Sequence, residues 1–195
     1  MFETLDDVRT DCLNRLIRAP RDRKSPMHTP VVVTGDVDAR VMVLRAFDAQ
    51  RWRLRLHTDA RAPKSQVIAT DPRVALLLYD KGAKIQIRAR GTGEIVTAGP
   101  EVDAAWAAST NFARRCYLGD GPGAASETPT SGLPPEFEGV EPDDIQILPA
   151  RENFALLMIT LTSLDWLYLA HTGHVRAQFA RADAASPWEG RWVAP

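Results

Sequence analysis

Basic and hydrogen-bonding side chains recur along several strand-like segments of this chain. The members of this set stand within or beside apolar runs: Arg40, Arg45, His57, Thr58, Lys64, Gln86, Arg88 and Arg90. Strands that build a core are normally apolar on their inner face, so several cations on neighbouring strands indicate an anionic ligand. The formal net charge of the whole chain is only -1, so such a site must come from local clustering.

The segment Thr-Asp-Ala-Arg-Ala-Pro-Lys at 58–64 joins the end of a predicted strand to the start of a predicted helix. Free backbone N–H groups and the positive end of the helix dipole favour an anion at such a junction. Thr58 adds a hydroxyl group, and Arg61 and Lys64 add positive charge. The segment therefore predicts a phosphate site, although a solvated basic turn would show the same residues.

Residues 85–90 alternate between apolar and polar side chains, which places Gln86, Arg88 and Arg90 on one face of a strand. An exposed strand face would show the same alternation. The amide of Gln86 can both donate to and accept from a heterocycle. Arg40 and Arg45 stand an odd number of residues apart, so a pocket that uses both requires a bulge or a strand end.

A sheet must position these side chains, because short strand patterns dominate the chain. Strands are predicted over 31–34, 40–47, 51–58, 74–79, 84–90, 94–97, 154–159, 164–169, 175–179 and 188–193. Helices are predicted over 3–18, 64–69 and, with a break, 100–117. Strands that are not separated by regular helices favour a mainly β fold with flanking helices, an antiparallel barrel rather than βαβ units.

Residues 119–149 are rich in Gly, Pro, Ser and acidic residues and have almost no periodicity. A loop of this length inside a compact domain is usually functional or mobile. The chain length suits one domain with a substantial core. We therefore expect residues 1–195 to form a single domain that includes the helix 3–18 and the loop 119–149.

The composition is that of an ordinary soluble globular protein, with 45% hydrophobic and 25% charged residues. The net charge gives no indication of nucleic acid as a partner. No apolar run approaches the roughly 20 residues that would span a membrane. Cys12 and Cys116 form no CxxC motif, and no signal peptide precedes them, so a cytoplasmic location is expected. His171 and His174 lack a third ligand, so no metal site is predicted.

Three motifs together resemble the pyridoxamine 5'-phosphate oxidase family, whose members are FMN-binding split β-barrels. They are Arg-Val-Met-Val-Leu-Arg at 40–45, His-Thr-x5-Lys at 57–64 and Gln-x-Arg-x-x-Gly at 86–91. The segment 71–77 between the motifs and the ending 188–195 are also similar to the family. The resemblance covers most of the chain from Val31, except the loop after Tyr117.

The resemblance implies an FMN site at the interface of a homodimer that acts on a small molecule. The implied cofactor-binding residues are Arg40, Val41, Met42, Val43, Leu44, Arg45, His57, Thr58, Lys64, Gln86, Arg88 and, from the second subunit, Trp166 (or Tyr168). Within this set Arg40 and Lys64 would hold the phosphate. His174 and Arg176 are the implied catalytic candidates.

Several departures from the family leave the substrate open. Pro63 replaces an arginine, Arg45 stands where a lysine is common, and 174–176 has the two ends of the family's Arg-Leu-His exchanged. The resemblance implies an FMN-dependent oxidoreductase that transfers hydride from its substrate to FMN. The alternative is a flavin-binding module with little turnover, such as a carrier, sensor or stress protein. The broader superfamily also includes relatives that bind haem or a deazaflavin.

Overall fold

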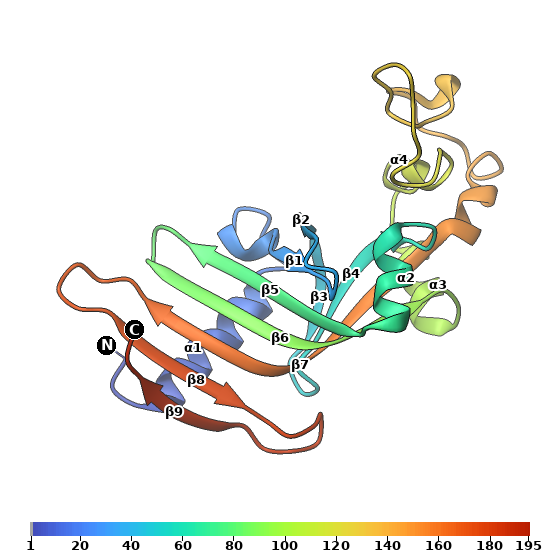
Figure 1. The fold of residues 1–195 in the computed structure, drawn as a ribbon. Helices are drawn as coiled ribbons and strands as arrows, with labels where there is room; N and C mark the ends of the chain where they lie inside the picture. Colours follow the sequence, from blue (N-terminus) through green and yellow to red (C-terminus); the bar gives the residue numbers. More distant parts are fainter. Residues whose placement is uncertain (1) are drawn as a thin grey trace.

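A curled antiparallel sheet forms the centre of the molecule, and short helices cover one end of it (Figure 1). The computed structural model describes residues 2–195. The strands are β1 (Val31–Val33), β2 (Ala39–Val41), β3 (Leu44–Asp48), β4 (Arg53–Asp59), β5 (Arg73–Asp80), β6 (Ile85–Val96), β7 (Phe154–Tyr168), β8 (Val175–Ala180) and β9 (Glu189–Val193). Their order is β2-β1-β5-β6-β7-β4-β3, with β8 and then β9 attached to β7. This half-barrel confirms the predicted fold class.

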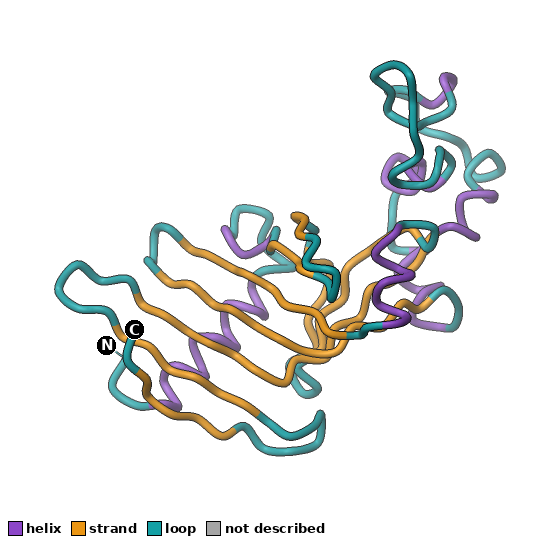
Figure 2. Tube along the Cα trace, viewed as in Figure 1, coloured by secondary structure: helices purple, strands orange, loops and turns teal. Residues whose placement is uncertain are grey.

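Helix α1 (Leu5–Arg18) lies across the inner side of the sheet (Figure 2). It begins two residues later than predicted because Thr4 is its N-cap. The Thr4 hydroxyl accepts from the backbone N–H of Asp7, and the Asp7 carboxylate accepts from the backbone N–H of Thr4. The buried face of α1 closes the main core, which contains Val8, Cys12, Leu16, Leu54, Leu56, Ile87, Leu164 and Trp166.

The region predicted as one strand over 40–47 is two strands, and this part of the prediction is wrong. Arg40 of β2 pairs with Val32 of β1, whereas Leu44 of β3 pairs with Leu56 of β4. The link between the two strands therefore crosses from one end of the sheet order to the other. This break, together with the register shift after Leu44, supplies the irregularity that a pocket using both Arg40 and Arg45 requires.

The segments 154–159 and 164–169, predicted as separate strands, form the single strand β7. Its first half pairs with β4 and its second half with β8, while β6 runs beside nearly its whole length. The β6 and β7 registers shift at Gly91, where a Cβ atom would lie 2.0 Å from the carbonyl oxygen of Thr160. Only glycine allows this close approach of the two backbones.

A second layer packs on the outer face of the sheet near the start of β7. It consists of α3 (Pro100–Ala107) and the 3-10 turns Arg115–Tyr117 and Leu148–Asn153. Val102, Ala105, Tyr117 and Phe154 are buried there in a separate cluster. Helix α2 (Pro63–Thr70) instead buries Ile68 in the main core. The remaining short elements are α4 (Asn111–Arg114) and the turns Pro26–His28 and Pro135–Phe137. Residues 119–149 are mostly irregular, as predicted, and extend away from the sheet (Figure 1).

A polar network ties α1 to the sheet. The indole Nε1 of Trp166 donates to the Asp11 carboxylate at 2.9 Å, and Arg15 Nε donates to the same carboxylate at 2.8 Å. Arg15 also pairs with Asp80 at the end of β5. Trp166 is fully buried, so its N–H has no access to water.

We expect Asp11→Ala to lower the free energy of unfolding by about 1–3 kcal/mol, because the buried indole N–H loses its acceptor. Asp6→Ala is the matched control, since Asp6 pairs with Arg9 on the exposed side of the same helix, and its effect should stay within about 0.5 kcal/mol. Urea unfolding of both variants provides the measurement. Equal effects would show that the Asp11–Trp166 bond adds nothing to stability.

Candidate functional site

Arg40 and Lys64 form the first group of cations. Lys64 is the second residue of α2 and is half-buried, and it makes no hydrogen bond or ion pair with residues 2–195. Burial, followed by the positive charge of Arg40, lowers the pKa of Lys64. Arg40 donates to the Thr34 hydroxyl at 2.9 Å and pairs with Asp38. A desolvated ammonium beside a second cation calls for an anion to offset the two charges.

His57, Arg55 and Arg45 form a second group, on β4 and the start of β3. The Nε2 atom of His57 and the Nε atom of Arg55 are buried, and neither has a hydrogen-bond partner within residues 2–195. Burial, followed by the charges of Arg45 and Arg55, lowers the pKa of His57 to about 4. The imidazole is therefore neutral at pH 7. Buried polar atoms without partners indicate a ligand with polar edges at this place.

The turn between β4 and α2 is held by its own ion pair. Arg61 donates to both carboxylate oxygens of the buried Asp59, at 3.0 Å from Nε and 2.7 Å from Nη2. Thr58 is buried, and its hydroxyl donates to the backbone oxygen of Asp59 at 3.4 Å. Arg61 is ion-paired with Asp59, whereas Lys64 has no such partner in the described part of the chain. Of the two cations of this turn, Lys64 is therefore the one that can pair with a ligand.

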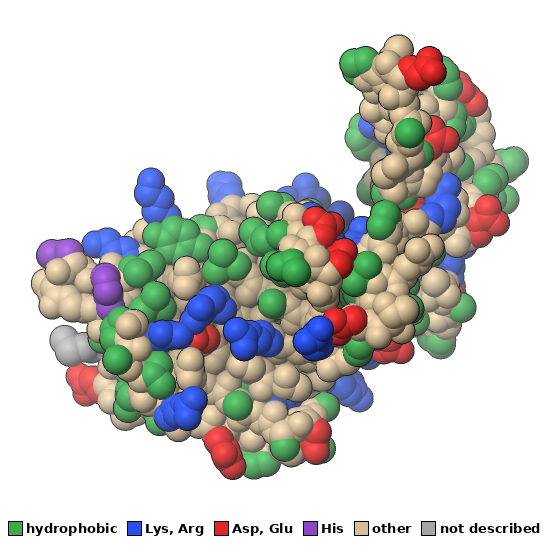
Figure 3. Space-filling view, viewed as in Figure 1, with side chains coloured by type: hydrophobic (Ala, Val, Ile, Leu, Met, Phe, Trp, Pro, Cys, Tyr) green, Lys and Arg blue, Asp and Glu red, His purple; other side chains and the backbone are tan. Residues whose placement is uncertain are grey.

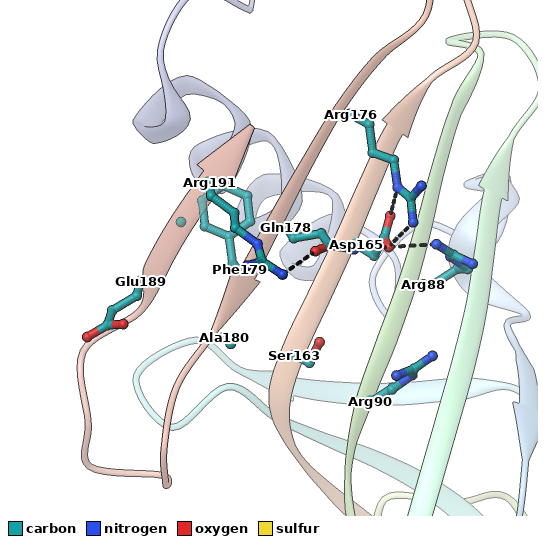
Figure 4. Close-up of a pocket in the computed structure, with 11 residues that line it drawn as sticks. Arg88, Arg90, Ser163, Asp165, Arg176, Gln178, Phe179, Ala180, Glu189 and Arg191 are labelled. Atoms are coloured by element: carbon teal, nitrogen blue, oxygen red, sulfur yellow. Dashed lines mark hydrogen bonds and ion pairs between the residues drawn. The ribbon is translucent and has the colours of Figure 1, made fainter. Parts of the chain in front are cut away.

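Lys and Arg side chains also gather across the outer face of the sheet (Figure 3). We call the groove of about 590 Å³ on this face the arginine groove; it is lined by Arg88, Arg90, Ser163, Asp165, Arg176, Gln178, Phe179, Ala180, Glu189, Gly190 and Arg191. These residues come from β6, β7, β8 and β9 (Figure 4). The sheet register places them in rows, with Arg88 opposite Asp165 and Asp165 opposite Gln178.

Asp165 is the centre of the arginine groove (Figure 4). Arg176 donates to its two oxygens at 2.9 and 2.7 Å, Arg88 donates at 2.6 Å and Gln178 at 3.0 Å. Burial opposes ionisation of Asp165, but these hydrogen bonds outweigh burial and lower its pKa to about 2. The carboxylate therefore stays ionised and orients Arg176 and Arg88.

The predicted site residues thus fall into two sets rather than one. His57 is opposite Leu156 on β7, whereas Gln86 is opposite Leu167 on the same strand. Eleven residues of strand correspond to roughly 30 Å or more. His57 and Thr58 therefore lie far along the sheet from Gln86 and Arg176 in one copy of the chain. Arg40 lies closer, because Val32 and Leu76 connect it across three strands to Ala89, at about 15 Å.

The other predicted residues take varied positions. In the run 41–44, Val41 is exposed, Met42 and Val43 are half-buried and Leu44 is in the core. Trp166 is fully buried beneath α1 and offers no surface to a cofactor, whereas Tyr168, the alternative, is half-buried. His174 is exposed in the turn before β8.

Sequence reasoning missed Arg55 and Asp165. Arg55 belongs to an alternating run with Arg51 and Arg53 that looks like a solvent face, but in the structure its Nε atom is buried. Asp165 gave no sequence signal, because its role depends on the register of three strands. Within residues 2–195 no three His, Cys, Asp or Glu side chains are grouped in a way that could hold a metal ion.

Comparison with known proteins shows which chains this one is similar to. Residues 15–97 match the family model described as pyridoxamine 5'-phosphate oxidase, FMN-binding domain. A pyridoxine/pyridoxamine 5'-phosphate oxidase of Caulobacter vibrioides is 33% identical over 90 residues, which are 46% of this chain and 39% of that protein. The match thus spans well under half of the Caulobacter protein. A Xanthomonas campestris protein of the same name is 29% identical over 177 residues and 84% of each chain.

Solved structures show the same fold. A pyridoxamine 5'-phosphate oxidase-related, FMN binding protein from Nostoc punctiforme aligns with a TM-score of 0.73 at 21% identity, covering 95% of this chain and 96% of that one. PhzG from Burkholderia lata, in complex with tetrahydrophenazine-1-carboxylic acid, aligns with a TM-score of 0.62 at 14% identity, covering 96% and 88%. Residues 15–97 are thus similar to the FMN-binding domain of the pyridoxamine 5'-phosphate oxidase family, and the whole chain shares the fold of these two solved structures.

Proposed function

We propose that the protein is a homodimeric, FMN-dependent oxidoreductase that acts on a small molecule. The observation that carries this proposal is the split arrangement of the site. His57 and Thr58, beside the half-buried Lys64, lie roughly 30 Å along β7 from Gln86. One flavin can contact both sets if they come from two copies of the chain.

The first set fits the phosphate end of FMN. Lys64 is half-buried without a partner and next to Arg40, so a phosphate would offset both charges. The buried Nε–H of Arg55 can donate to an oxygen of the ligand, and Nε2 of the neutral His57 can donate or accept. Neither atom has a partner among residues 2–195. Arg45 is exposed and adds a further positive charge to this set.

The second set fits the polar edge of the flavin ring. When bound, FMN would supply the two-electron chemistry. The Gln86 amide can donate to and accept from the ring edge. Asp165 holds Arg176 and Arg88 in place, so these guanidinium groups can orient a substrate carboxylate or phosphate without moving. His174, which is exposed two residues before Arg176, can exchange a proton with the substrate.

A second candidate function rests on the same Asp165. Its carboxylate already neutralises part of the charge of Arg176 and Arg88, which weakens their attraction for an anionic substrate. This favours a flavin-binding module with little turnover. A cytoplasmic location is part of either proposal, and both cysteines are free thiols, as a reducing compartment would keep them. Within residues 2–195 no helix is long and apolar enough to cross a membrane.

Absorption spectroscopy separates the two candidates. We expect the purified protein to show a flavin spectrum and to release FMN that is identified by its mass. Under anaerobic conditions a substrate of an oxidoreductase would bleach the bound flavin, and pyridoxamine 5'-phosphate is the first compound to test. Flavin that stays oxidised with every amine, alcohol and nicotinamide donor would support the module and contradict the enzyme.

Replacement of Lys64 tests the phosphate end of the site. Lys64→Ala should weaken FMN binding at least about tenfold, because a buried charge-assisted contact to phosphate is lost. Lys64→Arg keeps the charge and should retain most of the affinity. Lys81→Ala, in the exposed turn between β5 and β6, is the control and should bind FMN normally. Unchanged affinity in Lys64→Ala, measured by flavin fluorescence titration, would contradict this assignment.

His57 predicts an acid-dependent loss of stability. Its pKa falls from the ordinary 6.5 to about 4 in the folded protein, so below pH 6.5 the unfolded chain binds a proton that the folded chain does not. The stabilisation is complete above pH 6.5 and is lost as the pH falls towards 4. His57→Phe should therefore show a smaller drop in Tm between pH 7 and pH 4.5 than the wild type. The exposed His171→Phe control should behave like the wild type, and identical drops in all three proteins would refute the assignment.

A further inference from the structure

The segment 119–149, which we call the acidic arm, has an extreme charge. It contains seven acidic residues and no lysine or arginine, so the rest of the chain has 24 basic and 18 acidic side chains. The seven are Asp120, Glu127, Glu136, Glu138, Glu141, Asp143 and Asp144, all exposed. None of them forms an ion pair with any residue in the range 2–195. The arm therefore carries negative charge that its own copy does not neutralise.

The acidic arm also exposes apolar side chains and projects away from the sheet (Figure 1). Val140 is 54% exposed, Ile145 78% and Leu148 64%. Large aliphatic side chains gathered on a projecting segment are typical of a surface that contacts a partner. The arm thus combines negative charge with apolar surface.

The arginine groove offers the complementary combination. Arg90 is exposed and has no partner among residues 2–195, and Arg191 is exposed with a single hydrogen bond to Gln178. On the adjacent strand β5, Leu77 lies directly opposite Arg88 and is itself exposed. Tyr79 and Val41 extend this apolar strip on the same outer face. Positive charge thus lies beside exposed apolar surface.

The arm of one copy does not reach its own groove. Its base is fixed beside α4, where Asn111 bonds Asp144 at 2.8 Å, the Phe112 N–H bonds Glu141 at 3.0 Å and Arg115 bonds the Val140 carbonyl at 3.2 Å. The groove lies at the other end of the sheet, on β6 to β9 (Figure 1). Contact between the two surfaces therefore requires two molecules.

We propose that the acidic arm of one copy docks on the arginine groove and the adjoining apolar strip of a second copy. This inference rests on the homodimer proposed above, and it adds the acidic arm as a segment that contacts the second copy. The carboxylates of the arm and the arginines of the groove fix how the two surfaces align. The aliphatic side chains of the arm cover Leu77 and Tyr79. The arm would also cover the second set of site residues and exclude water from it.

Zero-length cross-linking tests the contact in the FMN-loaded full-length protein. Arg90→Lys and Arg191→Lys keep the charge of the groove and supply amines that a carbodiimide couples to carboxylates. Equal amounts of ¹⁴N and ¹⁵N protein are mixed and allowed to exchange subunits. We expect cross-links between the arm and position 90 or 191 that join peptides of different isotope. Cross-links confined to peptides of one isotope, or none at all in a flavin-loaded dimer, would overturn the docking but leave the dimer intact.

Charge reversal provides the energetic test. Glu127→Lys with Glu136→Lys should raise the dimer dissociation constant at least about tenfold, because like charges then face each other. Adding Arg90→Glu and Arg191→Glu to the same chain should return the dimer dissociation constant to the wild-type value. Glu3→Lys with Arg23→Glu, two exposed residues that line neither the groove, the apolar strip nor the arm, is the control and should change nothing. Failure of the combined variant to recover would sink the pairing, and a wild-type monomer that binds FMN would sink the homodimer itself.

Discussion

The length and the unbroken pairing of β7 are the constraint on which the rest of the structure depends. This strand of 15 residues pairs with β4 along its first half, with β8 along its second half and with β6 beside both. A rigid strand of this length fixes the distance between the polar groups at its two ends. It therefore keeps His57, near its start, apart from Gln86 and Arg176, near its end, and the homodimer proposed above would bring two such ends together.

The two surfaces differ in how their charges are balanced. Around Asp165 the cations have a carboxylate partner, and the low pKa of Asp165 records how strongly Arg176, Gln178 and Arg88 stabilise its ionised form. Around Lys64 no such carboxylate is in contact, and burial lowers the pKa of the ammonium instead. The first surface is thus organised before any ligand arrives, whereas the second stores unfavourable charge that an anionic group can relieve.

Much of the fold follows from local rules that the sequence displays openly. The Thr4–Asp7 capping box, Pro63 at the start of α2 and the alternation around Leu54 all form as their types and spacing predict. The division of 40–47 does not follow from local rules, because closure of the sheet decides where the chain crosses between strands. The two segments of β7 look like separate strands because the strand has one extra residue, Thr162, between the partners of Arg90 and Gly91, and this residue interrupts the alternation.

The site was predictable only in part, for a related physical reason. Residue type and order indicated Arg40 and Lys64, and in the structure the positive charge of Arg40 contributes to the lowered pKa of Lys64. Burial of Trp166 under α1 and the gathering of side chains around Asp165 depend on the registers of strands distant in sequence. The periodicity within one segment does not show which strands pair or in which register. The division of the predicted residues into two sets has the same origin.

Subunit complementation tests the central claim, a flavin site shared between two copies, most directly. One copy would carry Arg40→Ala and Lys64→Ala, the other Gln86→Ala and Arg88→Ala, and mixed dimers would be isolated through two different affinity tags. In a shared site of a two-fold dimer, one site then keeps both intact sets, so about one FMN should bind per mixed dimer. Each parent homodimer should bind FMN poorly. Mixed dimers that bind no better than their parents would show that each site is built within a single chain.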